Sequence, residues 1–185
     1  GPQGPKNGMG FDHGPIGGVL RSLVTFHTPD GGKELGQLVI PESLPYKADF
    51  SADGKTMYLA YRSTNKVAEI DVPSRTLKRL LIVGEGPTNA IVDKKGGKWL
   101  YAPSFYDSPA DISKMEIATG KVRALLPAKT SPAVIDQDKD SGLLYAVINA
   151  GNRILEIDPA GKGKITKEWP TGAFPLDIMV VSESA

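Results

Sequence analysis

Short runs of apolar residues alternate with short polar segments along most of this chain, and the polar segments have the composition of turns. In Lys66–Asp71 and Arg153–Asp158, apolar side chains alternate, with some irregularity, with charged ones. A period of two is typical of strands with one face buried. No stretch of about ten or more residues shows the apolar spacing of an amphipathic helix. The pattern therefore predicts an all-β protein.

The strand pattern is repeated along the chain. Each unit opens on a proline, at Pro45, Pro87, Pro132 and Pro175, with spacings of 42, 45 and 43 residues. A short apolar strand follows the proline, then a polar turn, an aromatic-bearing strand, a third strand ending in an acid, and a fourth strand. Four short antiparallel strands in each unit of 40–50 residues describe the blades of a β-propeller. The units are expected at about 45–86, 87–131 and 132–174, with a first unit at about 9–44 plus 175–185.

The two ends of the chain supply different parts of a blade. Ser22–Thr28 and Leu35–Ile40 align with third and fourth strands, and Met9–His13 could be a second strand. Leu176–Val181 aligns with an innermost strand that has no blade of its own. We therefore expect about four four-stranded blades, the C-terminal strand closing the ring on the N-terminal blade. A partial ring completed by another chain and a fragment of a longer propeller stay open, and residues 1–8 are expected to be a flexible lead-in.

The repeat also resembles a known family. Pro45–Ala60, with the third strands Thr64–Asp71 and Gly151–Asp158, is similar to the repeat of the YVTN-type β-propellers, a surface-layer and periplasmic class. The resemblance covers roughly residues 45–185. It implies the propeller fold and an extracytoplasmic location, periplasmic or secreted, but these propellers host many unrelated functions.

Composition narrows the functional classes. The chain of 185 residues has 22 basic and 21 acidic residues, and this balance gives no field that would gather nucleic acid. It has no cysteine, which excludes disulfides, thiolate metal sites and cysteine nucleophiles. No apolar run approaches the roughly 20 residues of a transmembrane segment. Frequent turns agree with the 21 glycines and 15 prolines.

Candidate binding residues come from the register of the repeat. Propellers bind ligands where the innermost strands begin, and the second position after each proline holds Lys47, Asn89 and Asp177 in three of the units. Together with Tyr46 they could form a channel-mouth site for a polar ligand or a cation. No cofactor is expected, while a divalent cation stays open. The acidic segment Asp136–Gly142 resembles a calcium loop without its closing glutamate, and we interpret it as a turn.

A second candidate is the connection that contains Phe105, Tyr106 and Asp107, which is longer than its equivalents in the other units. Loops carry binding functions more often than the scaffold does. Motifs of nucleophilic, phosphate-binding and zinc enzymes are missing.

The sequence therefore favours a non-catalytic propeller that binds a protein or carbohydrate partner or serves as a structural subunit, as a homo-oligomer or within a larger complex. Two alternatives are a metal-assisted, lactonase-like hydrolase at the channel mouth and an accessory subunit of a periplasmic redox complex.

Overall fold

The computed structural model describes residues 21–106, 110–127 and 130–181, and every regular element in these ranges is a strand. A two-stranded sheet comes first, formed by β1 (Ser22–His27) and β2 (Glu34–Ile40). Residues 1–8, Met9–His13 and Asp107 lie outside the described residues. The all-β prediction is confirmed.

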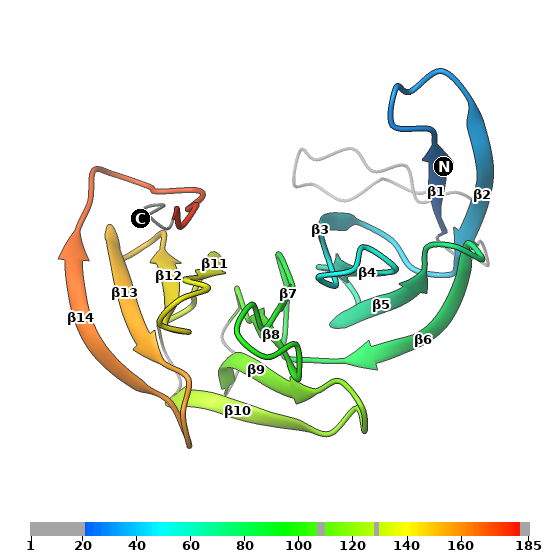
Figure 1. The fold of residues 1–185 in the computed structure, drawn as a ribbon. Coiled ribbons are helices and arrows are strands. Elements are labelled where there is room, and N and C mark those ends of the chain that lie inside the picture. Colours follow the sequence, from blue (N-terminus) through cyan, green and yellow to red (C-terminus); the bar gives the residue numbers. More distant parts are fainter. Residues whose placement is uncertain (1–20, 107–109, 128–129, 182–185) are drawn as a thin grey trace, which may run out of the picture.

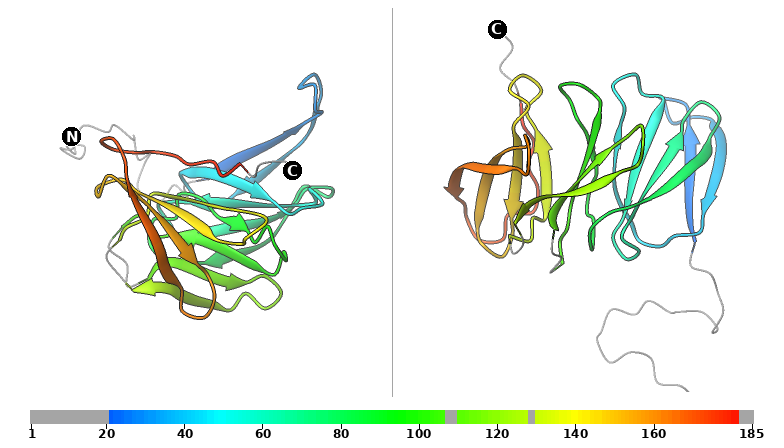
Figure 2. Two further views of the ribbon diagram at one scale, coloured as in Figure 1. Left: turned by 60° about the vertical axis from the view of Figure 1, so that its left-hand side comes forward. Right: turned by 90° about the horizontal axis from the view of Figure 1, so that it is seen from below.

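Three four-stranded antiparallel sheets follow, each running in sequence order from an inner to an outer strand. They stand side by side as an arc of blades, with β3, β7 and β11 on its inner side (Figure 1; Figure 2). The first is β3 (Pro45–Phe50), β4 (Thr56–Tyr61), β5 (Lys66–Asp71) and β6 (Thr76–Ile82). The second is β7 (Ile91–Val92), β8 (Trp99–Pro103), β9 (Ala110–Glu116) and β10 (Val122–Pro127). The third is β11 (Val134–Gln137), β12 (Leu144–Ile148), β13 (Arg153–Asp158) and β14 (Lys164–Pro170).

In two of the three four-stranded blades, the turn between the second and third strands contains an asparagine with a left-handed backbone. Asn65 and Asn152 take equivalent places, with φ of 57° and 49°. Asparagine tolerates this left-handed backbone better than most residues. Each side chain also accepts a backbone N–H from the loop that leads toward the next blade, from Gly86 at 3.1 Å and from Phe174 at 2.9 Å. The turn therefore anchors the connection between blades.

The hydrophobic core lies in layers between neighbouring sheets. One layer joins the β1–β2 sheet to the first four-stranded sheet, a second joins the first sheet to the next, and a third joins the last two. Fully buried members of these layers are Ile40 and Ile70, then Val67 and Leu100, then Ile112 and Leu155. Full burial of each such aliphatic side chain contributes about 1.5–3 kcal/mol. The apolar positions of the predicted strands thus form these layers.

The C-terminal segment differs from the expectation. Leu176–Val181 forms no strand, and within the described residues β1 and β2 pair only with each other. The chain instead returns from β14 to the inner side of the arc (Figures 1 and 2). There Asn149 Nδ2 donates to Pro175 O at 3.0 Å, and Val180 N donates to Asp136 Oδ2 at 2.7 Å. These contacts hold the segment beside β11, so the structure does not show it closing the ring, and completion by another chain stays a prediction.

Candidate functional site

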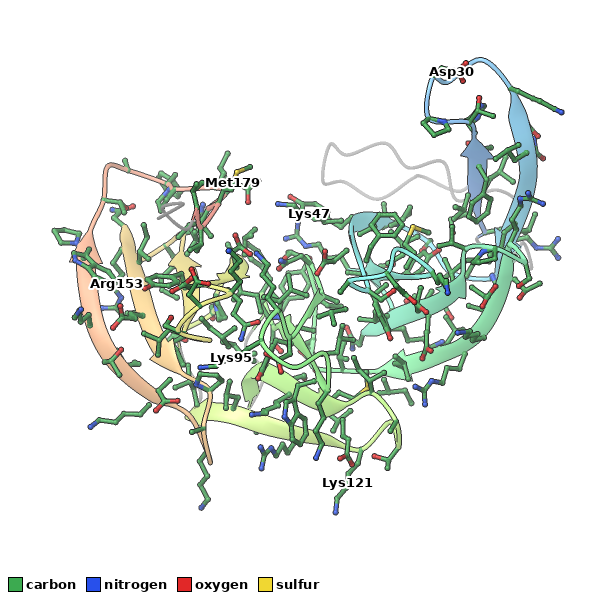
Figure 3. The ribbon with its side chains drawn as sticks, in the orientation of Figure 1. Asp30, Lys47, Lys95, Lys121, Arg153 and Met179 are labelled. Carbon is green, nitrogen blue, oxygen red and sulfur yellow. The ribbon has the colours of Figure 1, made fainter. Side chains whose placement is uncertain are left out.

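Three of the four residues predicted for the channel mouth, Lys47, Asn89 and Asp177, line one cavity. It has a volume of about 390 Å³ and lies between the inner strands β3, β7 and β11 and the C-terminal segment. Figure 3 shows Lys47 and Met179, two of its lining residues, at the inner side of the arc. Its charged and amide side chains are Lys47, Asp49, Asn89, Lys94, Asp136 and Asp177. Tyr46 is not among the lining residues.

Lys47 and Asp177 form an ion pair across this cavity. Lys47 Nζ lies 2.9 Å from both carboxylate oxygens of Asp177, although the two residues are 130 positions apart in the sequence. The side chains are 43% and 62% exposed, so solvent screens the pair. The hydrogen bond from Lys47 is the main cause of a lowered pKa at Asp177, which also accepts the backbone N–H of Ile178. The pair thus ties the C-terminal segment to β3.

Asn89 lines the cavity, and its side chain also joins two neighbouring blades. Its side chain is buried, donates to Ile135 O at 2.7 Å and accepts from Ile135 N at 3.3 Å. The neighbouring Thr88 hydroxyl donates to Ala133 O in the same way. Both the donor and the acceptor of the Asn89 amide are therefore engaged with the next inner strand. This side chain therefore joins two blades, and one acceptor position of its oxygen is used for that contact.

Three charged cavity residues were not among the predicted site residues. Asp49 Oδ2 accepts the backbone N–H of Val92 at 3.0 Å. Asp136 accepts from Lys94 Nζ at 2.5 Å and from Val180 N at 2.7 Å. The signal that could have found the two aspartates is their shared place, the fourth position after the unit's proline. The cavity is therefore lined by charges that already have partners within the protein.

Metal ligands do not gather in the described ranges. Within residues 21–106, 110–127 and 130–181, no group of three or more His, Asp or Glu side chains could hold a metal ion. In the acidic segment Asp136–Gly142, Asp138 accepts the backbone N–H of Asp140 at 3.1 Å and the hydroxyl of Ser141 at 2.6 Å. These hydrogen bonds have the form of a side-chain-stabilised turn.

A second cluster of residues lies at the face of the arc on which the inner strands begin. β4 and β8 end on this face because each is antiparallel to the inner strand beside it. Tyr61 of β4 lies opposite Pro45 of β3, and Tyr101 of β8 lies opposite Ile91 of β7. Arg62 follows β4, and its guanidinium carbon lies over three aromatic rings. The distances to the ring centroids are 5.7 Å for Tyr46, 4.3 Å for Phe105 and 5.2 Å for Tyr106. We call these four residues the aromatic–arginine cluster.

The aromatic–arginine cluster is partly open to solvent. Tyr46 is 59% and Tyr106 is 49% exposed, and the Phe105 and Tyr106 rings meet edge to face with centroids 5.6 Å apart. Arg62 Nε is buried, and within the described residues it has no hydrogen-bond partner. Gly86 makes room for Tyr106, since a Cβ there would lie 2.4 Å from the ring. The structure thus brings Tyr46 together with Phe105 and Tyr106, through an arginine that the sequence analysis missed.

Two general findings bear on the class of protein. No helix in the described part of the chain is long and apolar enough to cross a membrane. No protein-family model matches the chain, and no curated protein matches it either.

Solved structures do resemble the fold. Hydrazine synthase from Kuenenia stuttgartiensis matches with a TM-score of 0.69 and 16% identity over 79% of this chain and 42% of its own. Virginiamycin B lyase from Staphylococcus aureus matches with a TM-score of 0.60 and 17% identity over 82% of this chain and 49% of its own. A dihydro-haem d1 dehydrogenase matches with a TM-score of 0.64 and 15% identity over 82% of this chain and 33% of its own. The chain thus spans about half, or less, of the length of these structures. At such identities the similarity supports the fold alone, and that fold is a β-propeller.

Proposed function

We propose that this chain is a non-catalytic binding subunit that engages a protein partner through the aromatic–arginine cluster. The observation that carries the proposal is the guanidinium of Arg62 set among the rings of Tyr46, Phe105 and Tyr106, two of which are about half exposed. Tyrosine and arginine are enriched among the residues that dominate protein–protein binding energy. The rings and the charge are already positioned before any partner arrives, which lowers the ordering cost of binding.

The geometry favours a protein over a carbohydrate. Phe105 and Tyr106 are inclined by 79° to each other, so they do not form a common flat platform on which a sugar ring could stack. The rings converge on one cation instead, and a cation beside exposed aromatic edges suits an acidic and apolar protein segment.

The alternative functions are affected differently by the geometry. A lactonase-like site would need the Asn89 side-chain amide as a ligand. That amide already donates through its nitrogen to Ile135 O and accepts through its oxygen from Ile135 N. An accessory subunit of a periplasmic redox complex is one form of the present proposal, because it also needs a docking surface. The extracytoplasmic location that the sequence resemblance implies belongs to the same proposal and is tested by fractionation of the source cells.

The test begins with a photo-crosslinking amino acid at position 106 in the native extract, followed by identification of the captured protein. That protein is then purified, and its Kd is measured by titration calorimetry for the original chain and for Arg62→Ala and Tyr106→Ala. We expect each change to weaken binding about tenfold or more. Ile82→Ala is the matched control, because Ile82 is a 72% exposed hydrophobic residue on the outer strand β6.

The outcomes separate the classes of partner. An unchanged Kd in both cluster variants, with folding verified by circular dichroism, would contradict the proposal. Binding to a glycan array that is lost in the same two variants would reassign the surface to a carbohydrate.

A further inference from the structure

The blades carry a three-residue row with a buried central residue, and in this row one blade departs from the other two. In each blade the third strand places one side chain between a tyrosine of the second strand and a basic residue of the fourth strand. The three rows are Tyr58–Glu69–Arg79, Tyr101–Lys114–Arg123 and Tyr145–Glu156–Lys167. The middle blade thus has a lysine where its neighbours have a glutamate.

In the neighbouring blades the central acid is buried and paired. Glu69 is 7% exposed, and its Oε2 lies 2.5 Å from Arg79 Nε. Glu156 is 5% exposed, lies 3.8 Å from Lys167 Nζ and accepts the hydroxyl of Tyr145 at 3.0 Å. Buried charges in folded proteins are generally paired in this way, because an unpaired one is costly.

Lys114 is equally buried but has no acidic partner at ion-pair distance in the described ranges. It is 5% exposed, and its Nζ donates to the backbone carbonyl of Pro159 at 2.7 Å. The residue opposite it, Arg123, is also a cation, and both lie over the ring of Trp99, at 4.6 Å and 4.9 Å from its centroid. Burial, and then the charge of Arg123, lower the pKa of Lys114. Two cations therefore share a place that holds one acid and one base in the other blades.

Lys114 lines a cleft between the second and third four-stranded sheets. The cleft has a volume of about 310 Å³, the size of a small-molecule site. Asp93 and Asp158 also line it, and their charges favour the protonated form of Lys114. Asp93 Oδ1 already accepts from Gln137 Nε2 at 3.1 Å, and Asp158 Oδ1 accepts from Ala160 N at 2.9 Å. These hydrogen bonds engage both aspartates within the protein.

We propose that this cleft binds a small organic carboxylate, whose acid group takes the place that the Glu69 and Glu156 side chains hold in the neighbouring blades. Lys114 Nζ pairs with the carboxylate, and Arg123 adds positive potential from the next strand. Trp99 and Tyr101 supply the apolar wall of the cleft. The site is independent of the aromatic–arginine cluster, so either proposal can fail without the other.

Succinate is the probe for this site. The Tm of the full chain is measured as succinate is added, against sodium chloride at equal ionic strength. Fluorescence is recorded in a Trp169→Phe background, which leaves Trp99 as the single tryptophan, because the chain has two. We expect a saturable change in Trp99 emission and a rise in Tm of about 2–4 °C at concentrations well above the Kd.

Variants at position 114 decide the outcome. Lys114→Glu restores the row of the neighbouring blades, and it should raise Tm without succinate and remove the succinate response. Lys114→Met should remove the response as well, and it serves if the glutamate variant does not fold. Lys33→Glu, in an exposed loop, makes the same change of charge and should keep the response.

A response equal to that of sodium chloride, or one that survives in the position-114 variants, would overturn the proposal. A response to phosphate but not to succinate would overturn the carboxylate assignment.

Discussion

The carboxylate of Asp136 accepts a hydrogen bond of 2.7 Å from the backbone amide of Val180. Asp49 holds the amide of Val92 in the same way, at 3.0 Å. Counted from the proline of each unit, both aspartates are the fourth residue and both valines are the fifth. The C-terminal segment thus docks on β11 as β7 docks on β3, in the place of the innermost strand of a further blade.

The first prediction is that Asp136→Ala releases this segment. A hydrogen bond to a charged acceptor contributes about 1.5–3 kcal/mol, so amide exchange at Val180 should accelerate by more than tenfold. Exchange is followed by mass spectrometry of peptides that cover residues 171–181. Asp136→Asn keeps an acceptor for the amide and should have a smaller effect, whereas equal exchange in the original chain and in Asp136→Ala would contradict the docking.

The second prediction concerns the pH dependence of the Lys47–Asp177 pair. The pKa of Asp177 is lowered in the folded chain. The stabilisation from the contact is therefore fully present at pH values above the usual aspartate pKa of about 3.9, and it is lost as the pH falls through the lowered pKa. Carboxyl carbon NMR of Asp177 should therefore titrate at higher pH in Lys47→Met than in the original chain. Exposed pairs contribute about 0.2–1 kcal/mol, so the unfolding free energy should change little. An identical Asp177 titration in both chains would rule out the pair.

The third prediction is that Asn89→Ala destabilises the fold. The change leaves Ile135 N and Ile135 O without their buried partner, at a cost of about 1–3 kcal/mol in the free energy of unfolding. Urea unfolding measures this loss. Thr88→Val is the matched neighbour, since it removes one hydrogen bond rather than two and should cost less. If Asn89→Ala kept full stability, the amide would not be joining the blades.

The strands could be predicted from the sequence because their information is local. Lys66–Asp71 and Arg153–Asp158 are strands with the bounds that the alternation of apolar and charged positions predicts. The proline register also placed Lys47 and Asp177 near each other, because each innermost strand begins at the same height. Here the repeat itself carries the information.

Features that depend on contacts between blades were less accessible. The Asn89 side chain was expected at the channel mouth, and only the position of β11 shows that it is engaged with Ile135. The position of Arg62 in the cluster could not be predicted from the sequence. The rings that it contacts belong to Tyr46, 16 residues before it, and to Phe105, more than 40 residues after it. The closure of the ring also depends on the angle between blades, which no local pattern contains.

The fourth prediction uses Gly86 to disturb the aromatic–arginine cluster without removing a ring. Gly86 has a φ of +65°, and a Cβ there would lie 2.4 Å from the Tyr106 ring. Gly86→Ala should therefore displace Tyr106 and weaken partner binding about as much as Tyr106→Ala does. The Kd for the crosslinked partner measures the effect. Gly54→Ala has a similar φ of +69° but nothing within 4 Å of its Cβ, so it should lower stability alone and leave the Kd unchanged.

The last prediction is a pH dependence of stability that Lys114 imposes. Burial lowers the pKa of Lys114 in the folded chain, whereas in the unfolded chain it returns to about 10.4. Between these two values the unfolded chain binds more protons, so the unfolding free energy should rise with pH across this interval.

Urea unfolding of the original chain and of Lys114→Met between pH 7 and about pH 10 provides the measurement. Burial raises the pKa of Tyr58 to about 12 and also raises that of Tyr101, so both tyrosines oppose folding only in the more alkaline range. They do so in both chains, and the difference between the two chains isolates position 114. That difference should move in favour of the original chain as pH rises. If the difference did not depend on pH, Lys114 would have the same pKa in the folded and the unfolded chain. That result would contradict the assignment of Lys114 as a buried cation without an acidic partner.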